Sequence, residues 1–156
     1  MREPVDAGRA VRVGGMAEDC VFCAIVAGRI PSTKVAEDER TFAFMDINPG
    51  SEGHALVIPK EHAPDLLSIP AEDLAACALM GQRIAQRAVA ADGLGADGVN
   101  LVNSCGAAAW QTVFHFHLHV IPRYAGQPGR DSLQLPWTPA PADVTTLPAL
   151  ADRLRP

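Results

Sequence analysis

The sequence predicts an α+β protein built on an antiparallel sheet of about five strands with one long helix. Its strand-like segments follow one another across short turns, which is typical of antiparallel pairing. One stretch, residues 70–91, has apolar and small residues at spacings of three and four, which indicates a long helix. Helices and strands do not alternate along the chain as they do in a parallel sheet. Hydrophobic residues make up 48% of the chain and charged residues 20%, a composition typical of a globular domain.

The first half of the chain supplies a short helix and three strands. Residues 20–27 form a compact apolar segment, which predicts a short N-terminal helix that ends at Gly28. Residues 33–37 and 40–46 predict a hairpin, because aromatic residues alternate with smaller ones in the second segment. After the turn signal Asn-Pro-Gly, residues 54–59 predict the next strand.

The second half supplies the long helix and two more strands. Pro70 suits the first turn of the helix, and Gly93 suits its exit. Residues 98–103 predict a strand, and residues 104–111 predict a loop of small residues. Residues 112–121 predict the last and most regular strand.

The chain divides into three parts. Residues 1–17 contain glycines and scattered charges without a period, which predicts a disordered leader. Residues 18–125 form the folded domain. Residues 126–156 are rich in proline, and we expect an extended tail that wraps over a neighbour.

Charge and hydropathy exclude several classes of partner. The chain has 13 Lys and Arg against 18 Asp and Glu, and its net charge of −5 argues against a broad surface for nucleic acid. No apolar run approaches the ~18 residues that span a membrane. Residues 1–16 lack the apolar core of a signal peptide. We therefore expect a cytoplasmic protein that binds neither nucleic acid nor membranes.

Three histidines stand at every second position of the last predicted strand. Side chains alternate between the faces of a strand, so His115, His117 and His119 share one face. The other face carries the apolar residues that we expect in the core, namely Phe114, Phe116, Leu118 and Val120. Imidazole acts as a nucleophile, a proton carrier or a metal ligand, and the row suits attack on a phosphoryl group. A pure metal site and a row of solvated histidines remain alternatives.

The loop before this strand suits phosphate binding. Residues 106–109 have little bulk, so backbone N–H groups there can approach an anion closely. Gln111 and Thr112 add neutral hydrogen-bond donors. An ordinary turn is the alternative, because loops of small residues are common.

Two cysteines are spaced as in one half of a tetrahedral zinc site. Cys20 and Cys23 form a C-x-x-C pair, which in a reducing compartment indicates a metal or redox pair more often than a disulfide. A redox pair and two unrelated buried thiols remain alternatives. Cys77 falls on the core face of the long helix, and Cys105 lies near the small-residue loop without an assigned role.

The chain resembles the histidine-triad (HIT) family in three ordered blocks. Residues 111–123, QTVFHFHLHVIPR, match the signature Q-[ST]-V-x-H-x-H-x-H followed by the Pro-Arg of bacterial members. Residues 44–62 contain FMDINP, GHALVIPK and a later histidine, as in the middle block of the family. Residues 20–31 begin with CVFC and end with GRIP, as in its first block. The resemblance is to the zinc-containing bacterial type of the Hint-like nucleotide-binding branch, and it implies a HIT-like fold whose sheet extends across a homodimer.

The resemblance implies a role for each polar residue of the site. His117 would be the nucleophile that forms a nucleotidyl-histidine intermediate, and His119 would contact the same phosphate. Thr112 would bond the α-phosphate and help to protonate the leaving group, and His54 would orient the nucleophile. Asp46 would hold the ribose hydroxyls, although a turn residue is an equal alternative without the resemblance.

Other residues are implied to surround the nucleotide and the metal. The purine base would lie in an apolar slot formed by Val21, Phe22, Ile25, Phe44 and Ile47, which are otherwise plain core residues. Asn103 and Gln111 would face the phosphate. His62 and His115 would join the two cysteines in a closed Cys₂His₂ set, which makes the zinc structural. Trp110 departs from the family, since many relatives have glycine there, and its ring would narrow the site, cover the leaving group or anchor an interface.

The resemblance implies a purine nucleotide hydrolase or transferase that acts at the α-phosphate. Its substrates would be nucleoside phosphoramidates or acyl-nucleotides, such as conjugates of AMP. Two alternatives remain: a nucleotide-binding regulatory protein with little catalysis, and a dinucleoside polyphosphate hydrolase.

Overall fold

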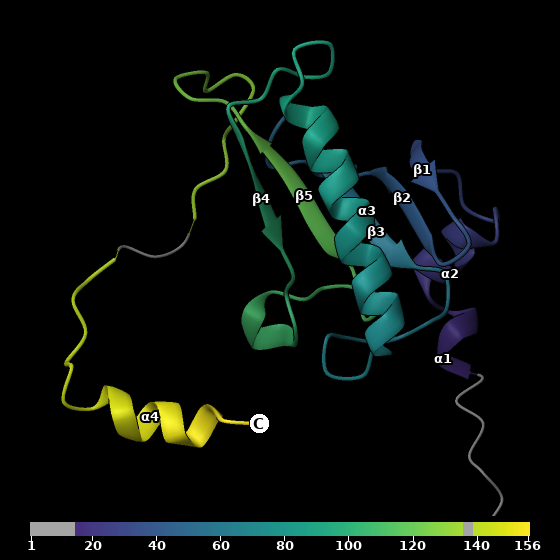
Figure 1. Ribbon diagram of the computed structural model, residues 1–156. Helices are drawn as coiled ribbons and strands as arrows, with labels where there is room; N and C mark the ends of the chain where they lie inside the picture. The colour runs from purple at the N-terminus through teal and green to yellow at the C-terminus, as the bar shows by residue number, and fades with distance from the viewer. Residues whose placement is uncertain (1–14, 136–138) are drawn as a thin grey trace, which may run out of the picture.

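The computed structural model describes residues 15–135 and 139–156, and its centre is a five-stranded antiparallel sheet (Figure 1). The strands are β1 (Lys34–Glu37), β2 (Thr41–Met45), β3 (Ala55–Pro59), β4 (Gly98–Val102) and β5 (Leu118–Arg123), in the order β1-β2-β3-β5-β4. The helices are α1 (Gly15–Glu18), α2 (Val21–Val26), α3 (Ala71–Val89), α4 (Leu147–Leu154) and the 3₁₀ turn η1 (Ala107–Ala109). The predicted α+β class, with one long helix and a short N-terminal helix, is confirmed.

The sheet lies between two helices of unequal length. The long helix α3 packs along one face, where its residues Cys77 and Met80 join Val57 and Val120 of the sheet in one core (Figure 1). The short helix α2 covers part of the other face, where Phe22 and Ile25 pack on aromatic and aliphatic side chains of β2 and β3. Leu56 of β3 belongs to this second core. The face under α2 is the one that carries the site described below.

The last strand is shorter than the sequence predicts. It begins at Leu118 and not at residue 112, and β3 pairs with it over only three residue pairs. The N–H of Phe116 donates to the carbonyl of Ala63 at 2.7 Å, so the chain before β5 bonds to the loop after β3 instead of to the strand itself. Pro59, at the end of β3, has no N–H with which to extend the ladder. Phe114 is 47% exposed, so its predicted place in the core is wrong.

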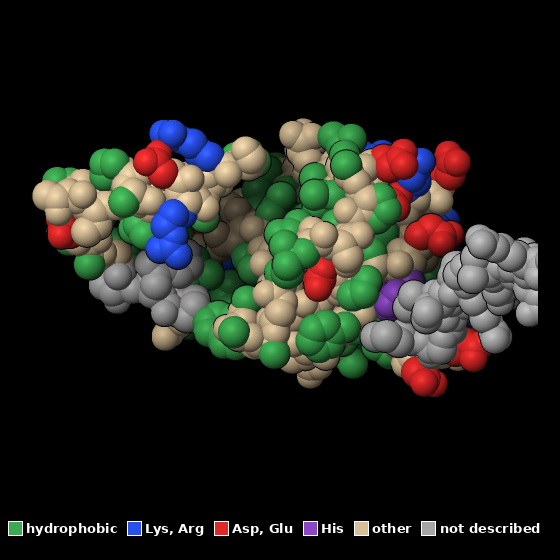
Figure 2. All heavy atoms as spheres, turned by 90° about the horizontal axis from the view of Figure 1, so that it is seen from below, with side chains coloured by type: hydrophobic (Ala, Val, Ile, Leu, Met, Phe, Trp, Pro, Cys, Tyr) green, Lys and Arg blue, Asp and Glu red, His purple; other side chains and the backbone are tan. Residues whose placement is uncertain are grey.

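The two ends of the chain differ from a simple leader and tail. Residues 1–14 of the expected leader lie outside the described residues, and Gly15–Glu18 form the helix α1. The tail is not wholly extended, because it contains α4. Figure 2 shows α4 as a separate lobe, with a hollow between it and the body of the molecule. The described part of the chain contains no helix long and apolar enough to cross a membrane.

The exit of α3 offers a test of the backbone geometry. A Cβ at Gly93 would lie 1.8 Å from the carbonyl oxygen of Arg87 and 3.2 Å from that of Ala90, and backbone cannot move aside cheaply. We expect Gly93→Ala to lower the free energy of unfolding by ~3 kcal/mol, the upper range for overpacking. Gly95→Ala is the matched control: its φ is +61°, but no atom lies within 4 Å of the new Cβ, so ~1 kcal/mol is expected. Urea denaturation measures the free energy of unfolding of both variants. A larger decrease for Gly95→Ala than for Gly93→Ala would contradict the close backbone contact at Gly93.

Candidate active site and metal centre

Two histidines of the triad line a cavity on the sheet face under α2. His119 pairs with Leu56 across β5 and β3, and directly opposed residues lie on the same face of a sheet. The rings of His117 and His119 have centroids 5.0 Å apart. Both border a cavity of about 360 Å³. The two rings therefore lie close together as the sequence predicts, although only His119 lies on a regular strand.

Hydrogen bonding sets the tautomer of His117. Its Nδ1 lies 2.8 Å from the carbonyl oxygen of His115, and since a carbonyl only accepts, Nδ1 carries the proton. Nε2 is then the unprotonated nitrogen with a free lone pair. Burial lowers the pKa of His117 and so favours the neutral ring near pH 7. The edge of Phe22 packs against this ring with centroids 5.3 Å apart, which limits its rotation. His117 has the protonation state of a nucleophile.

A second chain of hydrogen bonds sets the tautomer of His119. The N–H of Gly50 donates to Nδ1 of His54 at 3.0 Å, so the proton of His54 is on Nε2. That Nε2–H donates to Nδ1 of His119 at 2.9 Å, which leaves the proton of His119 on its Nε2. Burial lowers the pKa of His119 to about 4, and burial also lowers that of His54. His119 is therefore a neutral donor, and His54 contacts this ring and not the predicted nucleophile.

Asp46 lies beside the two rings, with Oδ2 3.6 Å from Nε2 of His54. Ligand atoms of these three side chains lie close enough together to suggest a metal site. Two nitrogens on one tetrahedral metal stand about 3.3 Å apart, given bonds of about 2.0–2.1 Å. The 2.9 Å between His54 and His119 is shorter and is a hydrogen bond. Oδ1 of Asp46 accepts from the N–H of Asn48 at 2.8 Å, so the predicted turn contact is present as well.

The cavity has apolar and polar walls. Its apolar walls include all five residues predicted for the base: Val21, Phe22, Ile25, Phe44 and Ile47. Phe22 and Phe44 meet edge to face at 5.4 Å, whereas Ile47 is 92% exposed and forms part of the rim. The polar walls include Ser32, Asp46, Asn48, Thr112 and the two histidines. A ligand with a flat apolar ring and hydrogen-bonding groups fits these walls.

Two residues that were expected to face the phosphate, Gln111 and Asn103, form hydrogen bonds to the backbone. The side chain of Gln111 is buried, accepts from the N–H of Gly106 at 2.8 Å and donates to the carbonyls of Pro64 and Val113. In this structure the amide of Gln111 therefore holds the loop in shape. Nδ2 of Asn103 donates to the carbonyl of His117 at 2.9 Å, so Asn103 supports the backbone beside the nucleophile.

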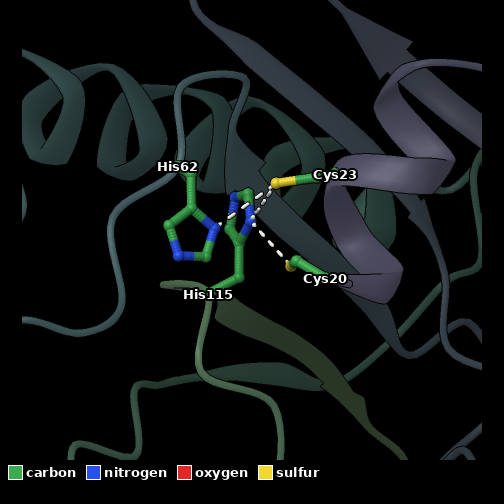
Figure 3. A group of neighbouring side chains, drawn as sticks. All are labelled: Cys20, Cys23, His62 and His115. Atoms are coloured by element: carbon green, nitrogen blue, oxygen red, sulfur yellow. Dashed lines mark hydrogen bonds between the residues drawn. The ribbon is translucent and has the colours of Figure 1, made fainter. Parts of the chain in front are cut away.

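The first histidine of the triad belongs to a separate cluster. His115 lies with Cys20, Cys23 and His62 so that one ligand atom of each falls within 4.8 Å of the others (Figure 3). Sγ of Cys23 is 3.3 Å from Nδ1 of His62, and Nδ1 of His115 is 3.5 Å from both sulfurs. Sulfur and nitrogen ligands of tetrahedral zinc stand about 3.6 Å apart, given bonds of about 2.3 and 2.0–2.1 Å. The cluster has the dimensions of a Cys₂His₂ zinc site.

Two further observations fit a metal at this cluster. Nε2–H of His115 donates to the carbonyl of Pro59 at 2.8 Å, which turns the lone pair of Nδ1 toward the sulfurs, as in metal-bound histidines. The pKa of Cys23 is raised to about 11, mainly by burial and to a smaller extent by the neighbouring Cys20. A cation between the sulfurs is what lets both ionise. The four donors suit structural zinc, since they fill all four tetrahedral positions.

Sequence reasoning missed the backbone partners of the histidines. The N–H of Gly50 and the carbonyls of Pro59 and His115 decide which nitrogen of each ring carries the proton. A backbone group has no residue-specific signature, so no motif reveals it. The Asn-Pro-Gly turn was the one available signal, because it places the N–H of Gly50 next to His54.

Residues 27–126 match the HIT domain family, and the chain belongs to that family. It is 50% identical over 103 residues to an uncharacterized HIT-like protein of Mycobacterium tuberculosis, a match that covers 66% of this chain and 70% of the relative. The resemblance to the HIT family read from the three sequence blocks is thus confirmed.

Two other relatives bear on the metal and on the chemistry. A Zn-bound histidine triad family protein of Mycobacterium smegmatis superposes with a TM-score of 0.69 at 47% identity, over 80% of this chain and 86% of that one. The adenylylsulfatase HINT3 of Arabidopsis thaliana is 44% identical over 105 residues, which are 67% of this chain. The match spans 52%, about half, of the plant protein.

Proposed function

We propose that this protein is a purine nucleotide hydrolase or transferase that acts at the α-phosphate through a nucleotidyl-histidine intermediate. The observation that carries the proposal is the pair of complementary tautomers, a free lone pair on Nε2 of His117 beside a proton on Nε2 of His119. The pair lines a cavity whose apolar walls suit a flat apolar ring. Substrates are nucleoside phosphoramidates or acyl-nucleotides.

The chemistry proceeds in two displacements at phosphorus. Nε2 of His117 attacks the α-phosphorus, the bond from phosphorus to the leaving group breaks, and the leaving group takes up a proton. The Thr112 hydroxyl and Nε2–H of His119 are donors that line the same cavity as His117. Water then attacks the same phosphorus, the bond from phosphorus to Nε2 of His117 breaks, and the water gives up a proton that replaces the one passed to the leaving group. His117 is released neutral, and the nucleoside monophosphate leaves. Donation from His119 to the phosphoryl oxygens stabilises the charge that develops in both transition states.

The remaining residues hold the nucleotide. Asp46 accepts from the ribose hydroxyls, and the apolar walls that include Phe22 and Phe44 enclose the base. The name of the Arabidopsis relative, adenylylsulfatase, refers to an adenylyl conjugate as substrate, which supports an adenine nucleotide as the substrate proposed here. Zinc, when bound, ties α2 to the segment before β5 and takes no part in the displacement.

We further propose a homodimer whose sheets join along β4. In the described sheet β4 is an edge strand, and Leu101 is half-exposed on it. An apolar edge strand without a neighbour is a site for pairing with a second chain.

Turnover of adenosine 5′-phosphoramidate by the purified zinc-loaded protein tests the proposed reaction. Release of AMP and ammonia is expected, with diadenosine tetraphosphate at the same concentration hydrolysed more slowly. Binding of AMP without release of ammonia would support the nucleotide-binding regulatory protein instead. A preference for the dinucleotide would support the polyphosphate hydrolase.

A further inference from the structure

Trp110 has an unusual backbone and an exposed ring. Its φ is +66° and ψ +23°, in the left-handed region, and it is the one non-glycine residue with positive φ in the described ranges 15–135 and 139–156. This conformation costs a residue with a side chain about 1–2 kcal/mol. The ring is 68% exposed, so burial of the indole within this chain does not offset that cost.

A second cavity begins where the nucleotide cavity ends. It has a volume of about 720 Å³, and its walls come from β4 and the loop after it, η1 with Trp110, β5 and residues 133–135 of the tail. His119 lines both cavities, and His54 lines the second one. The two cavities therefore meet at the ring that contacts the phosphate in the proposed function.

This arrangement fixes where the two halves of a substrate go. Attack at phosphorus is in line, so the leaving group points away from the attacking nitrogen of His117. His117 borders the first cavity and is absent from the walls of the second. With the nucleoside in the first cavity, the second is the space on the far side of His119 that is open to the leaving group.

The walls of the second cavity define the chemistry of its occupant. Its apolar part comprises Leu101, Val102, Ala108, Ala109, Trp110, Ile121, Leu133 and Leu135. Its polar part comprises the uncharged residues Asn100, Asn103, Ser104 and Gln134 together with the two histidines. No lysine, arginine, aspartate or glutamate is among these lining residues, so a charged side group finds no partner there. An indole stacks on flat rings and packs on apolar groups.

We propose that this cavity is the leaving-group subsite and that Trp110 sets its preference. The preferred leaving groups are amines and acids whose side groups are uncharged and either aromatic or bulky and apolar. The inference rests on the proposed function, because it assigns the other half of the same substrate. The backbone strain at Trp110 is consistent with a residue retained for its ring and not for its fit to the loop.

The test compares two phosphoramidates of adenosine 5′-monophosphate, one with ammonia and one with benzylamine as leaving group. In Trp110→Gly the ring is lost and glycine adopts φ +66° without strain, so the loop keeps its shape. We expect the ratio of kcat/KM for the benzylamine conjugate to that for the ammonia conjugate to fall about tenfold, as for the loss of one aromatic contact. Trp110→Phe keeps an aromatic ring and should hold the ratio within about threefold of the wild-type value.

Three outcomes would overturn the assignment. One is an unchanged ratio in Trp110→Gly. Another is a change in sedimentation from dimer to monomer with equal losses on both substrates, which would assign the cavity to a second copy of the chain. If the wild type turns over neither conjugate, calorimetry with AMP and with the benzylamine conjugate, which is then the stable analogue, replaces the kinetics. Loss of affinity in Trp110→Gly for the analogue alone would support the subsite although the proposed reaction had failed, and equal affinities would refute it.

Discussion

Replacement of His117 by alanine is expected to lower kcat for adenosine 5′-phosphoramidate by at least about 10³-fold, as expected when a covalent nucleophile is removed. No other described side chain combines a free ring nitrogen with a place between the apolar slot and His119. The affinity for AMP should change by less than about fivefold, because the apolar walls and Asp46 remain. Steady-state kinetics and calorimetry with AMP measure the two effects separately.

The matched control for this variant is His117→Asn. Asparagine keeps a side-chain N–H that can donate to the carbonyl of His115, as Nδ1 does at 2.8 Å, but offers no basic nitrogen for attack. Both variants should therefore lose turnover, and the asparagine variant should unfold at nearly the wild-type temperature. Substantial turnover by either variant, or a trapped nucleotidyl adduct on another residue, would disprove the role of His117.

Removal of the metal site is expected to produce the second large effect. In Cys23→Ser the zinc content should fall from about one ion per chain to near zero, since a neutral hydroxyl replaces a thiolate ligand. The midpoint of thermal unfolding should fall by about 10 °C or more, because metal binding contributes directly to folding free energy. Metal analysis and calorimetry of the purified protein give the two values.

Cys105→Ser is the control for the metal prediction. Cys105 is also a partly buried free cysteine, but it lies outside the cluster of four donors. Its zinc content should stay at the wild-type value. If Cys23→Ser and the wild type contained equal amounts of zinc, the assignment of the metal centre to this cluster would be wrong.

The sheet could be predicted from the sequence because it depends on local pattern, whereas most of the candidate site residues were expected only from the resemblance to the HIT family. Alternating aromatic residues mark β2, and the helix period marks α3 to within two residues of its ends. The spacing C-x-x-C and the regular histidines mark the two clusters. The pattern also misled: strict alternation predicts a strand through residues 112–117, but the N–H of Phe116 bonds to a loop, which no local pattern encodes.

The division of the triad could not be predicted from the alternation. Three histidines at period two predict one shared face, yet His115 joins the cysteines while the other two rings line the cavity under α2. That separation depends on the irregular backbone before Leu118. The helix α4 was likewise missed, because the proline content of the tail outweighed its short leucine period of 147, 150 and 154.

The helix α2 has only six residues, too few to be stable alone in water, so its position depends on what holds it. Cys20 and Cys23 attach it to the cluster of four metal-ligating side chains, while Phe22 and Ile25 form walls of the cavity proposed to hold the nucleotide. Two ligands that fix the same small element assist each other by an equal factor, whichever binds first. Nucleotide and zinc should therefore be cooperative ligands of this fold, even though they share no coordinating atom.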